Sequence, residues 1–172
     1  MTAIYKKILQ WITLPVVCLL LLTGCDKEPK AISIATPAGS LVKTTLDTAD
    51  DFDMENKDGV LVVSQNKKIM LQLAIIDEET RKGHLDRIKK SNMAHIYQES
   101  GRQITYNMTD ARGLLNYRIL PVSDHLYMYG ETYLPKESAD KVWSRLSFEA
   151  EGHKKISGNP DAPAGEKPSC CQ

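Results

Sequence analysis

The sequence predicts an α+β domain, in which an antiparallel sheet carries helices packed on one face. Three observations support this class. Two β-rich runs joined by a short polar link predict a hairpin, three later runs separated by short turns predict a meander, and two stretches have apolar residues at helical spacing. Short turns join antiparallel neighbours, and a sheet of this kind with its helices on one face is an α+β arrangement. The predicted order is hairpin, helix, three-stranded meander, helix.

The hairpin is predicted over residues 60–76. Residues 60–64 and 69–76 are rich in valine, isoleucine and leucine, and four polar residues, Gln-Asn-Lys-Lys, join them. In the second run apolar side chains fall on both faces of the predicted strand, as expected for a strand in the middle of a sheet. Residues 41–59 give no clear pattern beyond one leading strand at about 41–46.

A first helix is predicted over about 78–98. Asp77 stands before an acidic first turn, Glu78 and Glu79, which is typical of a helix start. Positions then recur at roughly helical spacing, at Leu85, Ile88, either Asn92 or Met93, and Ile96. A helix with this pattern is expected to close near Gly101.

The meander and a second helix complete the predicted domain. Three β-rich runs, at 103–109, 114–122 and 126–134, are separated by short polar turns. After Pro135 apolar residues recur at i, i+3, i+4, i+7 and i+11, namely Ala139, Val142, Trp143, Leu146 and Ala150. This spacing predicts an amphipathic helix that ends the domain near residue 150.

The N-terminus has the pattern of a signal peptide. Lys6 and Lys7 form a positive start, and residues 8–22 are apolar apart from Gln10 and Thr13. A membrane-spanning helix needs about 20 apolar residues, whereas the apolar part of a signal peptide runs to about 15. Residues 1–24 are therefore predicted to be a signal peptide and not a transmembrane helix.

Leu22, Thr23 and Gly24 stand immediately before Cys25. This order resembles the lipobox of bacterial lipoproteins. The resemblance implies that the Cys25 thiol carries a diacylglycerol, that the chain is cut before it, and that the new amine is acylated with a fatty acid such as palmitate. Two or more fatty chains hold a protein firmly on a membrane. Asp26 resembles the aspartate that retains enterobacterial lipoproteins in the inner membrane, so we expect an anchor there, facing the periplasm, in preference to the outer membrane.

Cleavage before Cys25 would leave 148 of the 172 residues, enough for one domain. Segments rich in proline and glycine at 25–40 and 151–172 predict a tether and a disordered C-terminal tail, with one folded domain over 41–150. Without Lys6 and Lys7 the chain has 20 basic and 22 acidic side chains. This slightly acidic balance argues against a nucleic-acid partner.

The combination of features is similar to one known family. A lipobox followed by an aspartate, a polar tether, a hairpin that runs into a helix, and a meander that ends in Leu134 and Pro135 before a last helix resemble the DcrB family of bacterial lipoproteins, whose fold is PsbP-like. The resemblance covers residues 25–150 and rests on the order of the elements. It implies a non-catalytic role in the envelope and assigns no functional residues, and the long C-terminal tail departs from it.

The chain has no recognisable catalytic motif. It contains no G-x-S-x-G, no H-E-x-x-H and no phosphate-binding glycine loop, so we expect neither an enzyme nor a cofactor. Its histidines lack the spacing of metal ligands; they are His84, His95, His125 and His153. A calcium loop opened at Asp51 would need glycine sixth and glutamate twelfth, where Asn56 and Val62 stand. The acidic run 47–59 is therefore interpreted as a solvated turn, and a hydrolase or metal enzyme that uses His125 or these acids stays open as an alternative.

Tyrosines alternate along the last strand of the meander. Alternation places four polar or aromatic side chains on one face, Tyr127, Tyr129, Glu131 and Tyr133, and Tyr106 and Tyr117 of the neighbouring strands would join them. Left open, such a face resembles the aromatic surfaces that bind partner proteins. Under the helices, the same tyrosines would be core residues. Both alternatives stay open from the sequence.

Two further groups carry charge or thiols. The first helix is predicted to carry a basic stretch, Arg81, Lys82, Arg87, Lys89 and Lys90, that would suit either an anionic leaflet or an ordinary solvent face. Near the C-terminus Cys170 and Cys171 are adjacent, and Cα atoms about 3.8 Å apart are too close for a relaxed disulfide. The pair would bridge to a partner, bind a soft metal ion, or have no specific role.

Together these patterns predict a membrane-anchored periplasmic lipoprotein that acts as a non-catalytic binding or envelope-maintenance module, with another envelope protein as its partner. The alternative within binding is an immunity or exclusion lipoprotein that recognises an incoming toxin or phage component.

Overall fold

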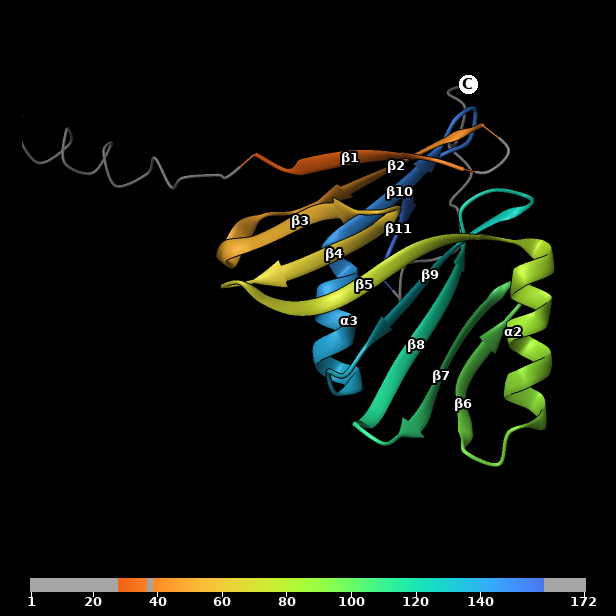
Figure 1. Ribbon diagram of the computed structural model, residues 1–172. Coiled ribbons are helices and arrows are strands. Elements are labelled where there is room, and N and C mark those ends of the chain that lie inside the picture. Colours follow the sequence, from red (N-terminus) through yellow and green to blue (C-terminus); the bar gives the residue numbers. More distant parts are fainter. Residues whose placement is uncertain (1–27, 37–38, 160–172) are drawn as a thin grey trace, which may run out of the picture.

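The computed structural model describes residues 28–36 and 39–159, and within them two antiparallel sheets and two α-helices are formed (Figure 1). The larger sheet has the strand order β3-β4-β5-β9-β8-β7-β6, and its strands are β3 (Phe52–Lys57), β4 (Val60–Gln65), β5 (Lys68–Asp77), β6 (Ala94–Ser100), β7 (Gln103–Asp110), β8 (Gly113–Pro121) and β9 (Leu126–Thr132). The smaller sheet has the order β1-β2-β10-β11, with β1 (Lys30–Ala35), β2 (Leu41–Leu46), β10 (Leu146–Ala150) and β11 (Ile156–Ser157). The helices are α2 (Glu78–Lys90) and α3 (Lys136–Ser144), and a short 3-10 turn, η1 (Ala49–Asp51), precedes β3. The predicted α+β class is confirmed.

The predicted hairpin is present as β4 and β5. Its two-residue turn consists of Asn66 and Lys67, whose φ angles are 50° and 65°. Two positive φ angles in succession are the mark of the type I′ turn, whose twist matches that of the flanking strands. Strand β5 lies between β4 and β9, which explains the apolar residues on both of its faces. The predicted strand at 41–46 is also present, as β2.

Strand β3 corrects the interpretation of the acidic run as a solvated turn. Phe52 and Met54 are buried, whereas the side chains of Asp53 and Glu55 point to solvent. A two-residue turn at Asp58 and Gly59, both with positive φ, returns the chain into β4. The acids therefore lie along the outer face of a strand whose inner face belongs to the core.

Helix α2 is shorter than predicted, and its last eight predicted residues were assigned wrongly. Ser91 is already extended (φ −91°, ψ 124°), and its N–H closes the helix on the Ile88 carbonyl. The chain then forms β6, in which Ala94 and Ile96 pack inward and His95 lies outside. Ile96 had matched the helical pattern only because it follows Ile88 by eight residues. The three-stranded meander is confirmed as β7, β8 and β9, with β6 added at its edge.

Helix α3 is also shorter than predicted. It ends at Ser144, and the residues expected in its last turns form β10, which pairs with β2. Along β10, Leu146, Phe148 and Ala150 are buried in a two-residue period. Leu146 and Ala150 follow Trp143 by three and seven residues, so they had fitted a helical spacing as well.

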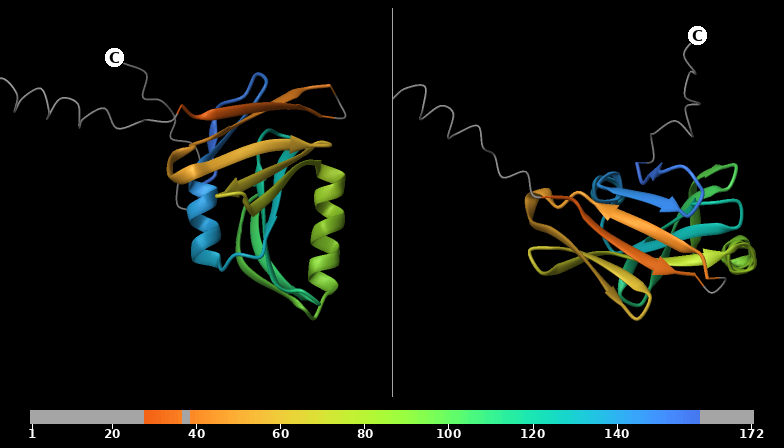
Figure 2. Two further views of the ribbon diagram at one scale, coloured as in Figure 1. Left: turned by 60° about the vertical axis from the view of Figure 1, so that its left-hand side comes forward. Right: turned by 90° about the horizontal axis from the view of Figure 1, so that it is seen from above.

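The expectation that both helices pack on one face is wrong. On β9 the ring of Tyr129 stacks against His84 of α2, with 4.9 Å between the ring centroids. The next residue, Gly130, faces α3, because a Cβ atom there would stand 2.4 Å from the Trp143 indole. Neighbouring residues of a strand point to opposite faces, so α2 and α3 lie on opposite sides of the larger sheet (Figure 2).

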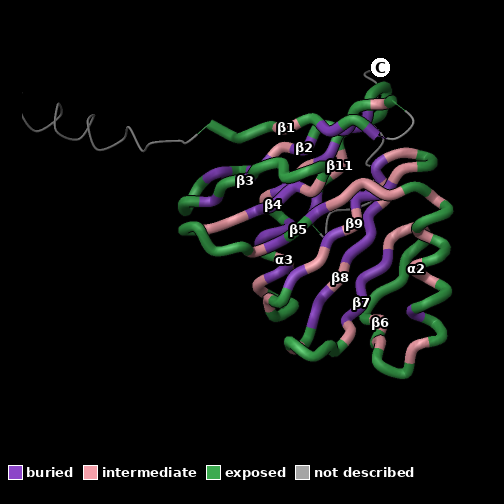
Figure 3. Tube along the Cα trace, viewed as in Figure 1, coloured by how far each residue is buried: buried purple, intermediate pink, exposed green. Residues whose placement is uncertain are grey.

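Each side of the larger sheet has its own apolar core. The α3 core joins α3, both sheets and the buried side of β3 to β5, with Trp143 and Phe148 among its largest members. The α2 core is smaller and consists of Ile88, Ile104, Tyr106, Ile119 and Tyr127. Figure 3 shows the buried stretches along the inner strands and exposed residues along β1 and the outer side of α2.

The folded region extends beyond residues 41–150 at both ends. In the expected tether, β1 pairs with β2, and Ile34 is buried in the α3 core. The Thr48 hydroxyl donates to the Glu28 carbonyl (3.0 Å), which fixes the chain from its first described residue. In the expected tail, β11 pairs with β10, and the Gly158 N–H donates to the Leu146 carbonyl (2.8 Å). Alternating Ile32 and Ile34 supply the inward side chains that a free tether would lack.

Several sequence predictions fall on residues that the structure does not describe. They concern the signal peptide at 1–24, the lipidation site Cys25, the retention signal Asp26, and the pair Cys170 and Cys171. Across residues 28–36 and 39–159, no helix has the length and apolar character needed to cross a membrane.

Candidate functional site

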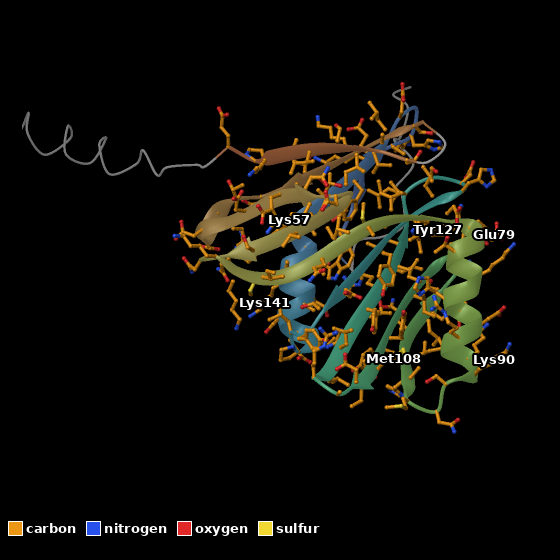
Figure 4. The ribbon with its side chains drawn as sticks, in the orientation of Figure 1. Lys57, Glu79, Lys90, Met108, Tyr127 and Lys141 are labelled. Atoms are coloured by element: carbon orange, nitrogen blue, oxygen red, sulfur yellow. The ribbon has the colours of Figure 1, made fainter. Side chains whose placement is uncertain are left out.

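Tyr127 lies beneath the first turn of α2 and is only 1% exposed (Figure 4). Its hydroxyl donates to the Glu78 carboxylate and accepts a hydrogen bond from Arg102 Nε (2.9 Å). The guanidinium groups of Arg81 and Arg102 stand 4.9 and 5.0 Å from the centre of its ring. Burial, and next the bond to Glu78, raise the pKa of Tyr127, so its hydroxyl stays a donor. Tyr127 therefore fastens the start of α2 to the sheet.

The next tyrosines form a stack under the middle of α2. The rings of Tyr106 and Tyr117 are parallel to within 10°, with centroids 4.7 Å apart. The ring centroids of Tyr117 and Tyr129 are 5.9 Å apart. Burial is the main cause that raises the pKa of Tyr106 and of Tyr129 far above the ordinary range. The Tyr129 hydroxyl donates to the Glu131 carboxylate (3.1 Å), which keeps this buried group satisfied.

The structure thus brings the tyrosines together on one face, as their spacing predicted, but covers most of that face with α2. Tyr106 and Tyr127 are core residues, and Tyr117, Tyr129 and Glu131 are half-buried. A continuous open aromatic surface is not formed. The interpretation in which the tyrosines pack beneath a helix describes these residues.

Tyr133 is the exception, because it stands beyond the reach of α2 and is 45% exposed. Its hydroxyl donates to Asp110 Oδ2 (3.0 Å), and the Arg112 guanidinium lies 5.1 Å from the centre of its ring. Arg112 in turn is 3.3 Å from the Asp110 carboxylate. The ring is thus exposed to solvent while both its hydroxyl and one of its faces are held.

The turn between β7 and β8 positions Asp110 and Arg112, the two side chains that hold Tyr133. Asp110 Oδ1 accepts hydrogen bonds from the backbone N–H groups of Arg112 (2.7 Å) and Gly113 (3.0 Å). The bond from the Arg112 N–H is the main cause that lowers the pKa of Asp110, with smaller contributions from the Tyr133 hydroxyl and the Arg112 side chain. Asp110 therefore stays ionised and accepts from Tyr133 at neutral pH.

A cavity of about 140 Å³ opens beside Tyr133, where β5 and β9 diverge. The last paired residues of these strands are Gln72 and Glu131, and beyond them the Thr132 hydroxyl donates to the Met70 carbonyl. The cavity is lined by residues 68–72 and 131–134 together with Leu115. We refer to these lining residues with Asp110 and Arg112 as the Tyr133 corner. Sites for cofactors and drug-sized ligands usually enclose about 300–1,000 Å³, so this cavity has room for one or two side chains.

The residues of the enzyme alternative lie apart from one another. His125 is exposed in the turn before β9. Asp53 is paired with Lys30 (2.7 Å), a bond that lowers the pKa of its carboxyl, and Asp50 is paired with Arg145. In the part of the chain that the structure describes, no three His, Cys, Asp or Glu side chains stand close enough to hold a metal ion.

The basic residues of α2 divide into two groups. The side chain of Arg81 is only 11% exposed and lies on Tyr127, and Arg87 donates to the Gly83 carbonyl and contacts His84. Lys82, Lys89 and Lys90 are exposed, and Arg87 is exposed as well in spite of these contacts. Burial, and next the positive Arg87, lower the pKa of His84, which lies against Tyr129. Of this stretch, Arg81 therefore serves the packing of α2 on the sheet, and the other basic residues lie on its solvent face.

No family model, no curated protein and no solved structure matches this chain. The lipobox and the resemblance to the DcrB family therefore stay predictions from the sequence.

Asp110 and Arg112 were missed as site residues by the sequence analysis. The signal was present, because an aspartate followed three residues later by glycine, as in Asp110 to Gly113, is typical of a turn closed by the aspartate side chain. The contact with Tyr133 spans 23 residues of sequence and has no local pattern.

Proposed function

We propose that this chain is a lipid-anchored protein of the bacterial envelope that acts by binding and not by catalysis, and that its partner binds at the Tyr133 corner. The proposed anchor is Cys25, supported by the lipobox pattern around it. The proposed binding site is supported by the geometry of Tyr133.

The observation that carries the binding site is an exposed aromatic ring that is already held in place. Tyr133 is 45% exposed, yet its hydroxyl is bonded to Asp110 and its ring is covered on one face by Arg112. A side chain that is ordered before binding loses little conformational entropy when a partner covers it. Tyrosine and arginine are also the residues enriched at the points of protein interfaces that contribute most to affinity.

The surroundings of Tyr133 favour a protein segment as the partner. Ile69, at the rim of the cavity, is 53% exposed, and covering the exposed half of such a side chain contributes about 1 kcal/mol. Lys68 and Glu131 line the same cavity with opposite charges. A partner that inserts one aliphatic or aromatic side chain, with polar groups on either side of it, would satisfy both the apolar wall and the charges.

The anchor is tested by the mass of the native protein. Purified from the membranes of a bacterium with intact lipoprotein processing, the chain is expected to begin at Cys25 and to carry the mass of the diacylglycerol and the amide-linked fatty acid. A Cys25→Ala variant is expected to carry neither. A native protein that kept Met1, or that had no lipid mass, would refute the anchor.

The binding site is tested by crosslinking in cells. A photo-crosslinking phenylalanine analogue in place of Gln72, an exposed residue of the cavity, is expected to trap a discrete partner, and the trapped segment is expected to contain an apolar residue. The same analogue in place of Gln98, exposed on the edge strand β6, is the matched control.

A second substitution separates binding from folding. Tyr133→Ala is expected to abolish the crosslink from position 72 while the domain stays folded, at a loss of about 1 kcal/mol in the free energy of unfolding, because the hydrogen bond to Asp110 and the contact with Arg112 are removed. An equal yield of the same crosslinked product from positions 72 and 98, or a yield unaffected by Tyr133→Ala, would refute the site.

A further inference from the structure

The connection between the proposed anchor and the folded domain is very short. The chain is fixed from Glu28, whose carbonyl accepts the Thr48 hydroxyl, and Lys30 already pairs with Leu46 in the smaller sheet. Glu28 is the third residue after Cys25, with only Asp26 and Lys27 between them. Because an extended chain spans at most about 3.6 Å per residue, Glu28 lies within about 11 Å of Cys25 whatever path the chain takes.

A polar headgroup layer is about 5–7 Å thick on each side of the hydrocarbon core. A cysteine whose fatty chains lie in that core has its backbone at the level of the headgroups. Because the span from Cys25 to Glu28 is at most about 11 Å and part of it lies among the headgroups, Glu28 lies close to the membrane surface. A water layer as wide as a protein domain does not fit between them.

The structure shows which surface surrounds Glu28. The start of β1 is tied to β3 through the Lys30 to Asp53 ion pair (2.7 Å). The turn between β4 and β5 is tied to η1, because the Asn66 N–H donates to the Asp51 carbonyl (3.4 Å). The start of β1, the start of β3 and this turn lie at the same end of the domain (Figure 1). We refer to Lys30, residues 49–51, Asp53 and residues 66–68 as the anchor end.

The anchor end carries three carboxylates, Asp50, Asp51 and Asp53, and three lysines, Lys30, Lys67 and Lys68, so its fit to an anionic surface depends on which of these charges are already paired. Asp50 is paired with Arg145, which also contacts Asp47 (3.3 Å), and Asp53 is paired with Lys30. Lys67 and Lys68 are exposed and have no ion pair with any residue in the described ranges. Two lysines without an ion pair in the described ranges therefore stand at and just after the β4–β5 turn of the anchor end, where they can bind phosphate oxygens.

We propose that the anchor end rests on the lipid headgroups, with Lys67 and Lys68 in contact with anionic lipid phosphates. This proposal rests on the lipid anchor of the proposed function. The surface is specified by two observations: the two-residue connection between Cys25 and Glu28, and the bonds that join Glu28, β3 and the β4–β5 turn into one end of the domain.

The test couples the domain to vesicles by a chemical route that needs no cellular enzyme. Residues 25–172 with Cys170→Ser and Cys171→Ser keep every described residue and one thiol, Cys25. That thiol is joined through a thioether to a maleimide-bearing lipid in vesicles of phosphatidylethanolamine and phosphatidylglycerol. Lysine acetylation by a water-soluble ester, read by mass spectrometry, then reports the exposure of each lysine.

Acetylation of Lys67 and Lys68 is expected to slow by about fivefold or more on the vesicles, the factor that corresponds to about 1 kcal/mol per lysine at an anionic surface. Lys89 and Lys90, at the C-terminal end of α2, are the internal controls and are expected to react as they do in solution; Figure 4 labels Lys90. Insertion of a flexible segment of about 15 Gly and Ser residues between Lys27 and Glu28, with an average span of about 20 Å, is expected to remove the protection.

Equal protection of Lys67 and Lys90 on the vesicles would overturn the proposal, and so would protection that survives the lengthened connection. Since the coupling is chemical, either result would leave the native lipid anchor untouched. Conversely, a native protein without lipid would fail the proposed function while the vesicle result stood.

Discussion

The two faces of the larger sheet are built on different principles, although both start from the same strand. On the α3 side, β9 contributes Met128 and Gly130 to a large aliphatic core closed by Trp143. On the α2 side, the alternating residues Tyr127 and Tyr129 form a smaller core of stacked rings and polar contacts. The α3 side depends on shape, since Gly130 is needed for the close approach of the indole. The α2 side depends on hydrogen bonds and ring contacts that fasten a single helix.

The α3 side also contains a buried cation. Arg118 is 3% exposed, bonds to the Asp140 carboxylate and the Gly158 carbonyl, and lies 5.1 Å from the Trp143 ring centre. A buried charge is tolerated only with partners, and here α3 and the residue after β11 supply them. Loss of packing on this side therefore disturbs more of the molecule than loss of a contact under α2.

The largest effect is expected from Trp143→Ala. The substitution removes a 2% exposed indole from the centre of the α3 core and is expected to lower the free energy of unfolding by about 4 kcal/mol. Denaturant unfolding followed by circular dichroism measures it. Trp143→Phe, which keeps an aromatic ring, is the control and is expected to cost clearly less. If Trp143→Ala lowered the free energy of unfolding by less than Tyr127→Phe does, the α3 side would not be the side that contributes more to stability.

A smaller effect is expected from Tyr127→Phe on the α2 side. The ring and its two flanking guanidinium groups remain, but the hydrogen bonds to Glu78 and Arg102 are lost. This loss is expected to lower the free energy of unfolding by about 1 kcal/mol. Amide hydrogen exchange is expected to speed up in the first turns of α2 and to stay unchanged in α3. Uniform acceleration in both helices would show that the two sides do not open separately.

The smallest effect is expected from His84. Burial, and next Arg87, lower its pKa, while Glu131 acts in the opposite direction. The fold therefore favours the neutral imidazole, so this stabilisation is present above the ordinary histidine pKa of about 6.5 and is lost as the pH falls through the lower folded value. Wild type is expected to lose stability between pH 7 and pH 5, and His84→Gln to show a flatter profile over that range. Parallel profiles would exclude this role for His84.

Elements marked by turn chemistry were predictable from the sequence, and elements that begin where a helix ends were not. The β4–β5 hairpin and the runs of β7, β8 and β9 are separated by short polar turns, and they were predicted close to their true limits. Strands β6 and β10 were merged into helices, because Ile96 and Leu146 satisfy a helical spacing and a strand spacing at once. Only pairing with β7 and β2 decides between them.

The candidate site was predictable in part for the same reason. Alternation along β9 correctly placed the tyrosines on one face. It carries no information about which face a later helix will cover, because α2 crosses the sheet through contacts distant in sequence, such as Glu78 with Tyr127. Asp110, Arg112 and Tyr133 meet at one end of the sheet, where two turns come together, and that meeting is a property of the tertiary fold.

Strand β1 begins five residues after the proposed anchor. An anchor this close to the domain would confine its search for a partner to the membrane surface. Lys68 belongs both to the anchor end and to the Tyr133 corner, so in the proposed orientation the corner would open beside the bilayer. A search between two molecules confined to the same thin layer is two-dimensional, and the effective local concentration is far above that in the surrounding fluid. A weak contact at Tyr133 would then suffice for a partner embedded in the same leaflet, whereas a freely diffusing partner would need a much tighter one.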